Sequence, residues 1–233
     1  MNSLGMHRKV EPELLDHLPA CDPRAVRSRR DLRRINAWMG NVRAVAGALS
    51  GAGHPLIHVV ELGAGDGNFM LRVVQRLPRL EGPARVTLVD QQSIVGEETL
   101  RAFAAVGWQA ESVVADVFEW LCTSSAKTAD TIVANLFLHH LSEPELAALA
   151  RLAARNAKVF VANEPRRSAF ALLASKLLWL IGCHAVTRHD AVVSVRAGFR
   201  GNELSALWPN PERWQFTESR AGLFGHRFVA RRI

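Results

Sequence analysis

Cysteine is scarce in this sequence, and its spacing excludes two kinds of structure. The three cysteines, Cys21, Cys122 and Cys183, are far apart and none forms a C-x-x-C pair. Neither a disulfide framework nor a zinc site is therefore indicated. The first residues also lack the apolar stretch of a secretory signal. We expect a protein of the reducing cytoplasm that works without a metal.

Tyrosine is absent altogether, and the most apolar segment is too short to cross a membrane. Residues 169–183 include Lys176, whereas a membrane helix needs about 20 apolar residues. A segment that is apolar on nearly all sides must nevertheless be covered by something. We expect one of its faces to pack in the core against the sheet, and another to line a hydrophobic pocket.

Acidic residues are outnumbered, so the net charge is +7. The excess gathers in one helical stretch and near the C-terminus, as Arg24, Arg27, Arg29, Arg30, Arg33, Arg34, Arg227, Arg231 and Arg232. Basic runs can bind nucleic acid, but aromatic residues do not alternate with these as in a base-stacking surface. A solvated helix face is favoured, and we expect no nucleic-acid partner.

The length of 233 residues suits one α/β domain. Strand patterns alternate with helical ones, the strands at 57–62, 85–90, 109–114, 130–137 and 157–163 and the helices at 67–78, 93–106, 117–122 and 143–155. This alternation predicts a parallel sheet covered on both faces. Residues 11–50 are expected to be helical with a break near Asp22, and 214–220 and 226–231 to form a hairpin.

A glycine-rich turn follows the first expected strand and reads E-L-G-A-G-D-G over residues 61–67. Glycine tolerates positive φ, so the backbone can turn sharply and lie against a ligand. The dinucleotide motif G-x-G-x-x-G would need glycine at position 68, where this chain has Asn68. The spacing therefore argues against a dinucleotide. A turn that binds nothing is the alternative.

The E-x-G-x-G-x-G pattern resembles motif I of the class I S-adenosylmethionine-dependent methyltransferases. The resemblance covers about residues 40–233 and implies S-adenosyl-L-methionine as cofactor. It also implies an α/β fold with a doubly wound, mostly parallel seven-stranded sheet whose last strand is antiparallel. Residues 1–50 would form an N-terminal helical extension and 51–233 the methyltransferase domain, with a helical lid insert at 184–213. The implied cofactor-binding residues are Glu61, Gly63, Ala64, Gly65, Gly67, Asp90, Gln91, Asp116, Val117, Asn135 and Leu136.

Two acids end later strands of the pattern. Asp90 ends the second strand, where an acid about 20 residues past the glycines binds ribose hydroxyls. For Asp116, at the end of the third, the resemblance implies a hydrogen bond from the adenine amino group, with Gln91 and Val117 beside the ring. Each acid could instead cap the helix that follows it.

The residues at the end of the fourth expected strand indicate which class of acceptor is methylated. Family members that methylate exocyclic or amide nitrogen usually carry an Asn/Asp-Pro-Pro-aromatic motif there, which this chain lacks. Its Leu-x-His-His-Leu turn resembles members that methylate small molecules, including phenols of quinone and polyketide pathways. Asn135 would lie beside the methionine part of the cofactor.

Methyl transfer to oxygen requires in-line positioning and removal of a proton. A histidine with a pKa near 6.5 suits that task, so His139 and His140 are candidate bases. They could instead serve packing before the helix that Ser142 is expected to cap. The other candidate bases are His189 and Glu164.

Two further stretches refine the resemblance. Residues 33–40 and 193–199 look like bacterial methyltransferases associated with phenol-making polyketide synthases. Together with the apolar segment 169–183 and the insert 184–213, they favour an aromatic or lipid-tailed acceptor, delivered at a membrane surface that the basic face could approach.

The sequence therefore predicts transfer of a methyl group to a hydroxyl of a hydrophobic phenolic or quinone-like small molecule. One alternative is an RNA or protein methyltransferase, whose arginine face would line the cleft entrance. The other is a catalytically silent module that binds the cofactor.

Overall fold

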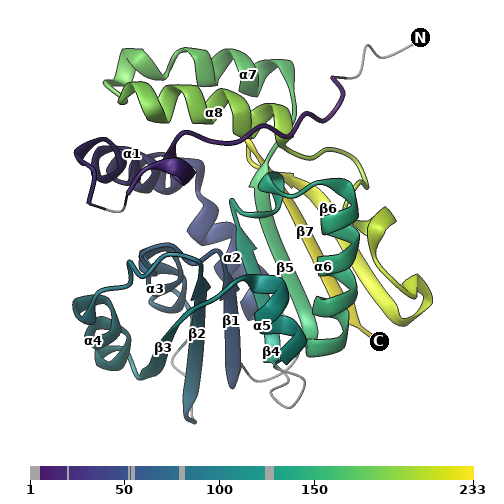
Figure 1. Ribbon diagram of the computed structural model, residues 1–233. Coiled ribbons are helices and arrows are strands. Elements are labelled where there is room, and N and C mark those ends of the chain that lie inside the picture. The colour runs from purple at the N-terminus through teal and green to yellow at the C-terminus, as the bar shows by residue number, and fades with distance from the viewer. Residues whose placement is uncertain (1–5, 20, 52, 54–55, 79–81, 124–128) are drawn as a thin grey trace.

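A computed structural model describes residues 6–19, 21–51, 53, 56–78, 82–123 and 129–233 (Figure 1). Seven strands form one sheet in the order β3-β2-β1-β4-β5-β7-β6. The strands are β1 (His58–Leu62), β2 (Ala84–Asp90), β3 (Trp108–Val114), β4 (Ala129–Asn135), β5 (Ala157–Pro165), β6 (Trp214–Ala221) and β7 (Gly225–Arg232).

The sheet is mostly parallel. Strands β1 to β5 pair in parallel, and β7 is antiparallel to both β5 and β6. The predicted fold class, including the antiparallel last strand, is confirmed. The strand order reverses between β1 and β4, and an open α/β sheet binds ligands at the carboxyl ends of the strands beside such a point.

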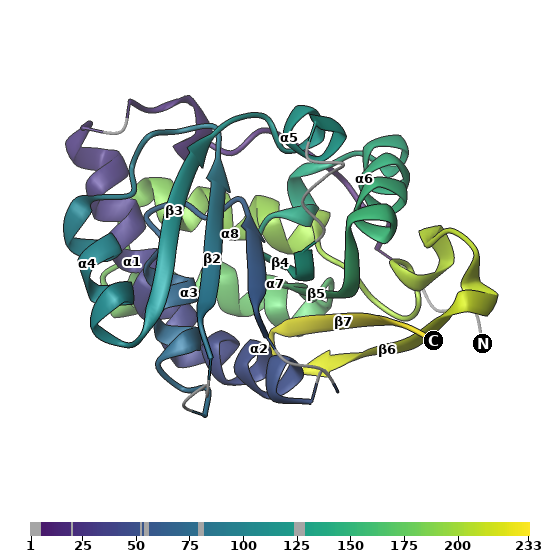
Figure 2. The same ribbon diagram turned by 90° about the horizontal axis from the view of Figure 1, so that it is seen from below.

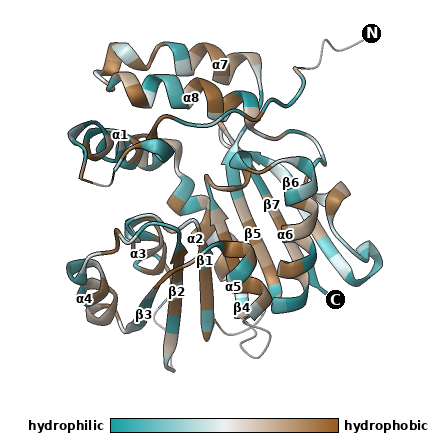
Figure 3. Cartoon of the chain, viewed as in Figure 1, coloured by the Kyte–Doolittle hydropathy of each residue, from teal (hydrophilic) through white to brown (hydrophobic). Residues whose placement is uncertain are grey.

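Helices cover both faces of the sheet (Figure 2). One face packs against α2 (Asn41–Ser50), α3 (Asn68–Val74) and α4 (Glu97–Ala105), and the other against α5 (Val117–Thr123) and α6 (Glu143–Asn156). The central strands are strongly apolar, as Figure 3 shows, because side chains on both their faces are buried. The capping box predicted at the start of α6 is present, formed by Ser142 and Glu145.

Three helices lie beyond the carboxyl ends of the strands: α1 (Pro23–Met39), α7 (Ala169–Lys176) and α8 (Ala185–Ala197). Helix α7 packs against α8, and α8 contacts α1. The expected single segment 169–183 is in fact α7 followed by the short 3-10 helix η3 (Leu178–Ile181). The expectation that this segment packs on the sheet is wrong, because α7 packs against α8. Its small residues Ala171 and Ser175 are buried and most of its large ones are exposed.

The segment before α1 also departs from expectation. Residues 6–17, called here the N-terminal strap, are irregular apart from the 3-10 turn η1 (Leu15–His17), whereas helix was expected from residue 11. The amides of Leu14 and Leu15 donate to the carboxylate of Asp190 instead of to helix carbonyls. Residues 1–5 of the expected extension lie outside the described residues. In the described part of the chain, no helix is long and apolar enough to cross a membrane.

Candidate cofactor and acceptor site

A cavity of about 900 Å³ lies at the carboxyl ends of the strands. Small-molecule sites usually measure about 300–1,000 Å³, so this one has room for a nucleoside cofactor and a second molecule. Its walls come from the strand ends, the N-terminal strap, α1, α7 and η3. The predicted cofactor residues that line it are Glu61, Gly63, Ala64, Gly65, Asp90, Gln91, Asp116, Val117, Asn135 and Leu136.

The glycine loop enters the cavity with positive φ at Gly63, Gly65 and Gly67. A Cβ at Gly63 would stand 2.5 Å from Cδ2 of Phe137, so the loop can only approach the end of β4 as glycine. At Gly65 a Cβ would meet nothing within 4 Å, so the cavity side of the loop is open there. Gly67 does not line the cavity, and a side chain at this position would meet Leu88.

Glu61 is fully buried at the base of this loop. Among the described residues, nothing hydrogen-bonds to its Oε2. Burial, together with the negative charges of Asp66 and Asp90, raises the pKa of Glu61 well above its usual value. A buried carboxyl with an unpaired oxygen beside two other acids is suited to a ligand that carries positive charge. S-adenosylmethionine carries an ammonium and a sulfonium, so the residues fit this cofactor.

The two predicted nucleoside acids are both tied to backbone. Asp90 accepts from the amides of Gly65 and Gln92, each at 2.8 Å. Asp116 accepts from the amides of Phe118 and Glu119, which makes it the cap of α5 that was the alternative reading. A carboxylate oxygen can accept more than one hydrogen bond, so both acids keep capacity for ligand hydroxyls or amines.

The end of β4 is bound to its neighbour strand. Asn135 accepts from Nδ2 of Asn163 at 3.1 Å, and the amide of Leu136 donates to the Asn163 carbonyl. Leu136 has φ 52°, a left-handed conformation that costs a branched residue about 1–3 kcal/mol. Such strain concentrates at ligand sites. No sequence pattern pointed to it.

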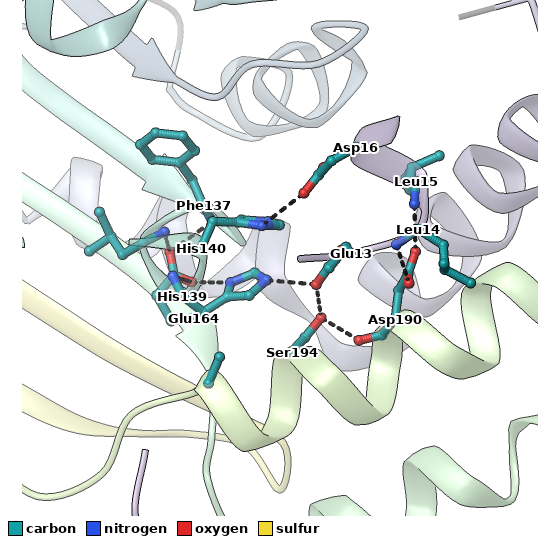
Figure 4. A network of polar contacts seen from close by, with 12 residues as sticks. Glu13, Leu14, Leu15, Asp16, Phe137, His139, His140, Glu164, Asp190 and Ser194 are labelled. Atoms are coloured by element: carbon teal, nitrogen blue, oxygen red, sulfur yellow. Dashed lines mark hydrogen bonds and ion pairs between the residues drawn. The ribbon is translucent and has the colours of Figure 1, made fainter. Parts of the chain in front are cut away.

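His139 is buried between two carboxylates, as Figure 4 shows. Its Nδ1 lies 2.8 Å from Oε2 of Glu164 and its Nε2 lies 3.2 Å from Oε1 of Glu13. Burial alone would lower the pKa of His139, but the hydrogen bonds and charges of the two glutamates raise it to about 9. A ring whose two nitrogens are both engaged in this way is poorly placed to take a proton from an acceptor.

The other candidate bases differ in their access to the cavity. His140 lines it and is partly exposed, with Nδ1 3.3 Å from Oδ2 of Asp16. Glu164 is fully buried behind the wall and accepts from the amides of Phe137 and Leu138. His189 pairs with Asp190 but borders a separate, smaller hollow. The structure thus brings His139, His140 and Glu164 together and leaves His189 apart.

The N-terminal strap supplies site residues that sequence reasoning missed. Glu13 and Asp16 reach the cavity from it, and the hydroxyl of Ser194 in α8 donates to Glu13. Arg8 fixes the strap by donating from Nε to the carbonyl of Ala197 at 2.8 Å. An irregular segment has no periodicity that could have revealed these contacts. We call the four cavity-wall residues Glu13, Asp16, His139 and His140 the polar corner.

The opposite wall is aromatic and aliphatic. Phe224, in the loop between β6 and β7, stacks between Trp38 and Phe170 with ring centroids 5.8 and 5.6 Å apart. From α7 and η3, the cavity is lined by Leu173, Leu177, Leu178, Leu180 and Ile181. Trp38, Phe170, Leu173 and Leu180 are each more than half exposed, so the rim of the cavity is apolar as well.

Part of the basic stretch faces this site. Arg33 forms an ion pair of 2.7 Å with Asp66 of the glycine loop, and Arg29 donates to Gln92. Both arginines line the cavity. The expectation of a purely solvated face therefore does not hold for them, because α1 crosses the cofactor end of the cavity.

Comparison with known families gives one match. Residues 59–159 match the family described as "Methyltransferase domain", a stretch that runs from β1 into β5 and contains the glycine loop and both histidines of the polar corner. No curated protein matches the sequence.

Solved structures resemble the fold at low sequence identity. The magnesium protoporphyrin IX methyltransferase of Synechocystis PCC 6803, with bound SAH, is 16% identical with a TM-score of 0.54, covering 84% of this chain and 83% of that one. A plantazolicin methyltransferase with a triazolic desmethylPZN analog and SAH is 12% identical with a TM-score of 0.63, covering 93% and 92%. An O-methyltransferase family protein of Burkholderia thailandensis is 18% identical with a TM-score of 0.60, covering 91% and 61%.

Proposed function

We propose that this chain is a class I S-adenosylmethionine-dependent methyltransferase that methylates a hydroxyl of a hydrophobic phenolic or quinone-like small molecule, a proposal supported by its fold and by the domain match. The observation that carries the proposal is one cavity with three different walls. The glycine loop with its acids forms the first wall, the aromatic and aliphatic residues form the second, and the polar corner forms the third.

The cofactor end is assigned to the first wall. Glu61 would hold the positively charged amino group, Asp90 the ribose hydroxyls, and Asp116 with Gln91 the adenine. When bound, S-adenosylmethionine supplies a methyl group already activated on a sulfonium. The protein's remaining tasks are to orient the acceptor and to remove its proton.

The acceptor end is assigned to the apolar wall. The stacked rings of Trp38, Phe224 and Phe170 offer flat faces to an aromatic ring, and the aliphatic side chains of α7 and η3 continue the wall outward. The solved plantazolicin methyltransferase complex, which holds an azole analog, is a fold neighbour with a small-molecule acceptor. A hydrophobic acceptor could enter across the exposed rim from a membrane surface.

Removal of the proton from the acceptor hydroxyl is assigned to the polar corner. His140 is the best placed of the predicted bases, since it lines the cavity and its ring is partly exposed. Glu164 and Glu13 hold His139 in a fixed position beside it, with the two imidazole centroids 4.2 Å apart.

The test is product analysis with matched acceptors. Purified protein, S-adenosylmethionine and an alkylated phenol should give the methyl ether, identified by mass spectrometry and NMR. The corresponding aniline and the phenol already methylated on oxygen serve as controls and should give no product. Methylation of carbon or nitrogen, or of added RNA with strong salt dependence, would contradict the proposal.

A further inference from the structure

We propose that the polar corner binds a divalent first-row transition-metal ion through Glu13, His139 and His140. One ligand atom from each of these residues lies within 4.8 Å of the other two. The cluster joins two parts of the chain far apart in sequence, the N-terminal strap and the turn after β4, as Figure 4 shows. Two imidazoles and a carboxylate are a donor set typical of such ions.

The distances suit a shared ion. Nε2 of His139 and Oε1 of Glu13 are 3.2 Å apart. Two ligand atoms that lie about 2.1 Å from one ion, at an angle of about 90–110°, are about 3.0–3.4 Å from each other. His140 is held from the exposed side by Asp16, whose Oδ2 lies 3.3 Å from Nδ1 of His140.

The support behind His139 has the form found behind metal-bound histidines. Oε2 of Glu164 lies 2.8 Å from Nδ1, so Nδ1 would keep its proton for Glu164 while a bound ion would replace the proton that Nε2 shares with Glu13. Glu164 is itself held by the amides of Phe137 and Leu138. Because Glu13, His139 and Glu164 are each less than a tenth exposed, two of the three ligands, Glu13 and His139, are held in place before an ion arrives.

The donor set also discriminates between ions. Mg²⁺ and Ca²⁺ prefer sites made of oxygen ligands, whereas imidazole suits Zn²⁺, Fe²⁺, Co²⁺ and Ni²⁺. Three protein ligands in a cavity wall leave coordination positions open for a molecule in the cavity, which is the arrangement of catalytic rather than structural zinc sites.

The role of the ion rests on the proposed function, although its binding does not. An ion in this wall would favour the ionised form of an acceptor hydroxyl that coordinates it. His140 would then hold the ion rather than take the proton itself. The sequence-based expectation of methyl transfer without a metal would be overturned.

The experiment uses the full chain without a histidine tag, stripped with a chelator and titrated calorimetrically with Zn²⁺. We expect one ion per chain at micromolar affinity or tighter. His140→Ala and Glu13→Gln should each weaken binding at least 100-fold, and His189→Ala, outside the corner, should not change it. Co²⁺ added to the stripped protein should give a visible d–d spectrum that His140→Ala abolishes.

Three results would overturn the site: no Zn²⁺ binding, equal binding by the His140→Ala and His189→Ala proteins, or a Co²⁺ spectrum indifferent to His140→Ala. In each case a proton on His139 would be the cation between the two glutamates. Binding of S-adenosylhomocysteine and the melting temperature show that the variants are folded. Since the readout is metal binding, failure here is distinguishable from failure to methylate a phenol.

Discussion

Oδ2 of Asp90 accepts the amide hydrogen of Gly65 at 2.8 Å, so the acid that ends β2 holds the glycine loop of β1 in place. Asp90→Ala should therefore weaken S-adenosylhomocysteine binding in two ways. It removes the proposed hydrogen bonds to the ribose hydroxyls, and it releases the glycine loop that the carboxylate holds in place. A charged hydrogen bond is worth about 1.5–3 kcal/mol, so we expect a loss of at least about tenfold in calorimetric titration. Unchanged affinity in a folded Asp90→Ala protein would remove ribose recognition by this residue.

Glu61 should make cofactor binding pH-dependent. Its pKa is raised by burial and by the charges of Asp66 and Asp90, so the free protein keeps a proton there above the usual carboxyl range. The ammonium group of the ligand favours the ionised carboxylate of Glu61, and binding must then release that proton. Affinity for S-adenosylhomocysteine should rise with pH and level off above the raised pKa. Calorimetry in buffers of different ionisation enthalpy would detect the proton.

Glu61→Gln is the matched control for this effect. Glutamine has nearly the same shape but cannot ionise. The variant should therefore bind S-adenosylhomocysteine more weakly, and its affinity should no longer rise with pH through ionisation of residue 61. A pH slope equal to that of the wild-type protein would show that another group releases the proton.

The first two glycines of the loop, Gly63 and Gly65, should respond differently to substitution by alanine. Gly63→Ala meets Phe137 and also requires a left-handed alanine, so we expect a loss of about 2–4 kcal/mol in the free energy of unfolding. Gly65→Ala has open space and suffers mainly the conformational cost, about 1 kcal/mol. Urea unfolding of both variants would measure the difference. Equal losses would mean that the contact with Phe137 is readily relieved.

A buried pair in the C-terminal hairpin should contribute to acid sensitivity. Burial opposes ionisation of Glu218, but hydrogen bonds from His226, Ser205 and two backbone amides outweigh it and lower its pKa. A depressed carboxyl pKa stabilises the fold above the unfolded value of about 4.3, and this contribution is lost as the pH falls through the folded pKa. The stability difference between wild type and Glu218→Gln should therefore be constant near neutral pH and shrink below about pH 4. Urea titrations at several pH values would show it, and a constant difference down to pH 3 would contradict it.

Strand periodicity predicted the parallel strands and the hairpin, and the resemblance carried by the glycine spacing implied the seven-stranded sheet. The residues that it implied for the cofactor gather at one end of the cavity, and their binding of the cofactor stays a prediction. Both patterns depend on residues close in sequence, such as the glycines at 63, 65 and 67. The acceptor end depends on contacts over long separations. Glu13 meets His139, and Trp38 meets Phe224. Glu13 and Phe224 lie in irregular segments that have no periodic pattern of their own. The strap was expected to be helical because propensity alone could not reveal that Asp190 takes its amide hydrogens.

The last prediction concerns His140. Whether it takes the acceptor's proton or holds a metal ion, His140→Ala should lower turnover by about 10²–10⁴-fold while leaving S-adenosylhomocysteine affinity nearly unchanged. His189→Ala is the control and should retain wild-type turnover, because His189 borders the separate, smaller hollow and does not line the cavity. A chelator separates the two roles. A base acting alone gives activity that resists chelation. A metal site gives activity that a chelator removes and Zn²⁺ or Co²⁺ restores. Wild-type turnover in both variants would leave the reaction to positioning of an already ionised acceptor in the cavity.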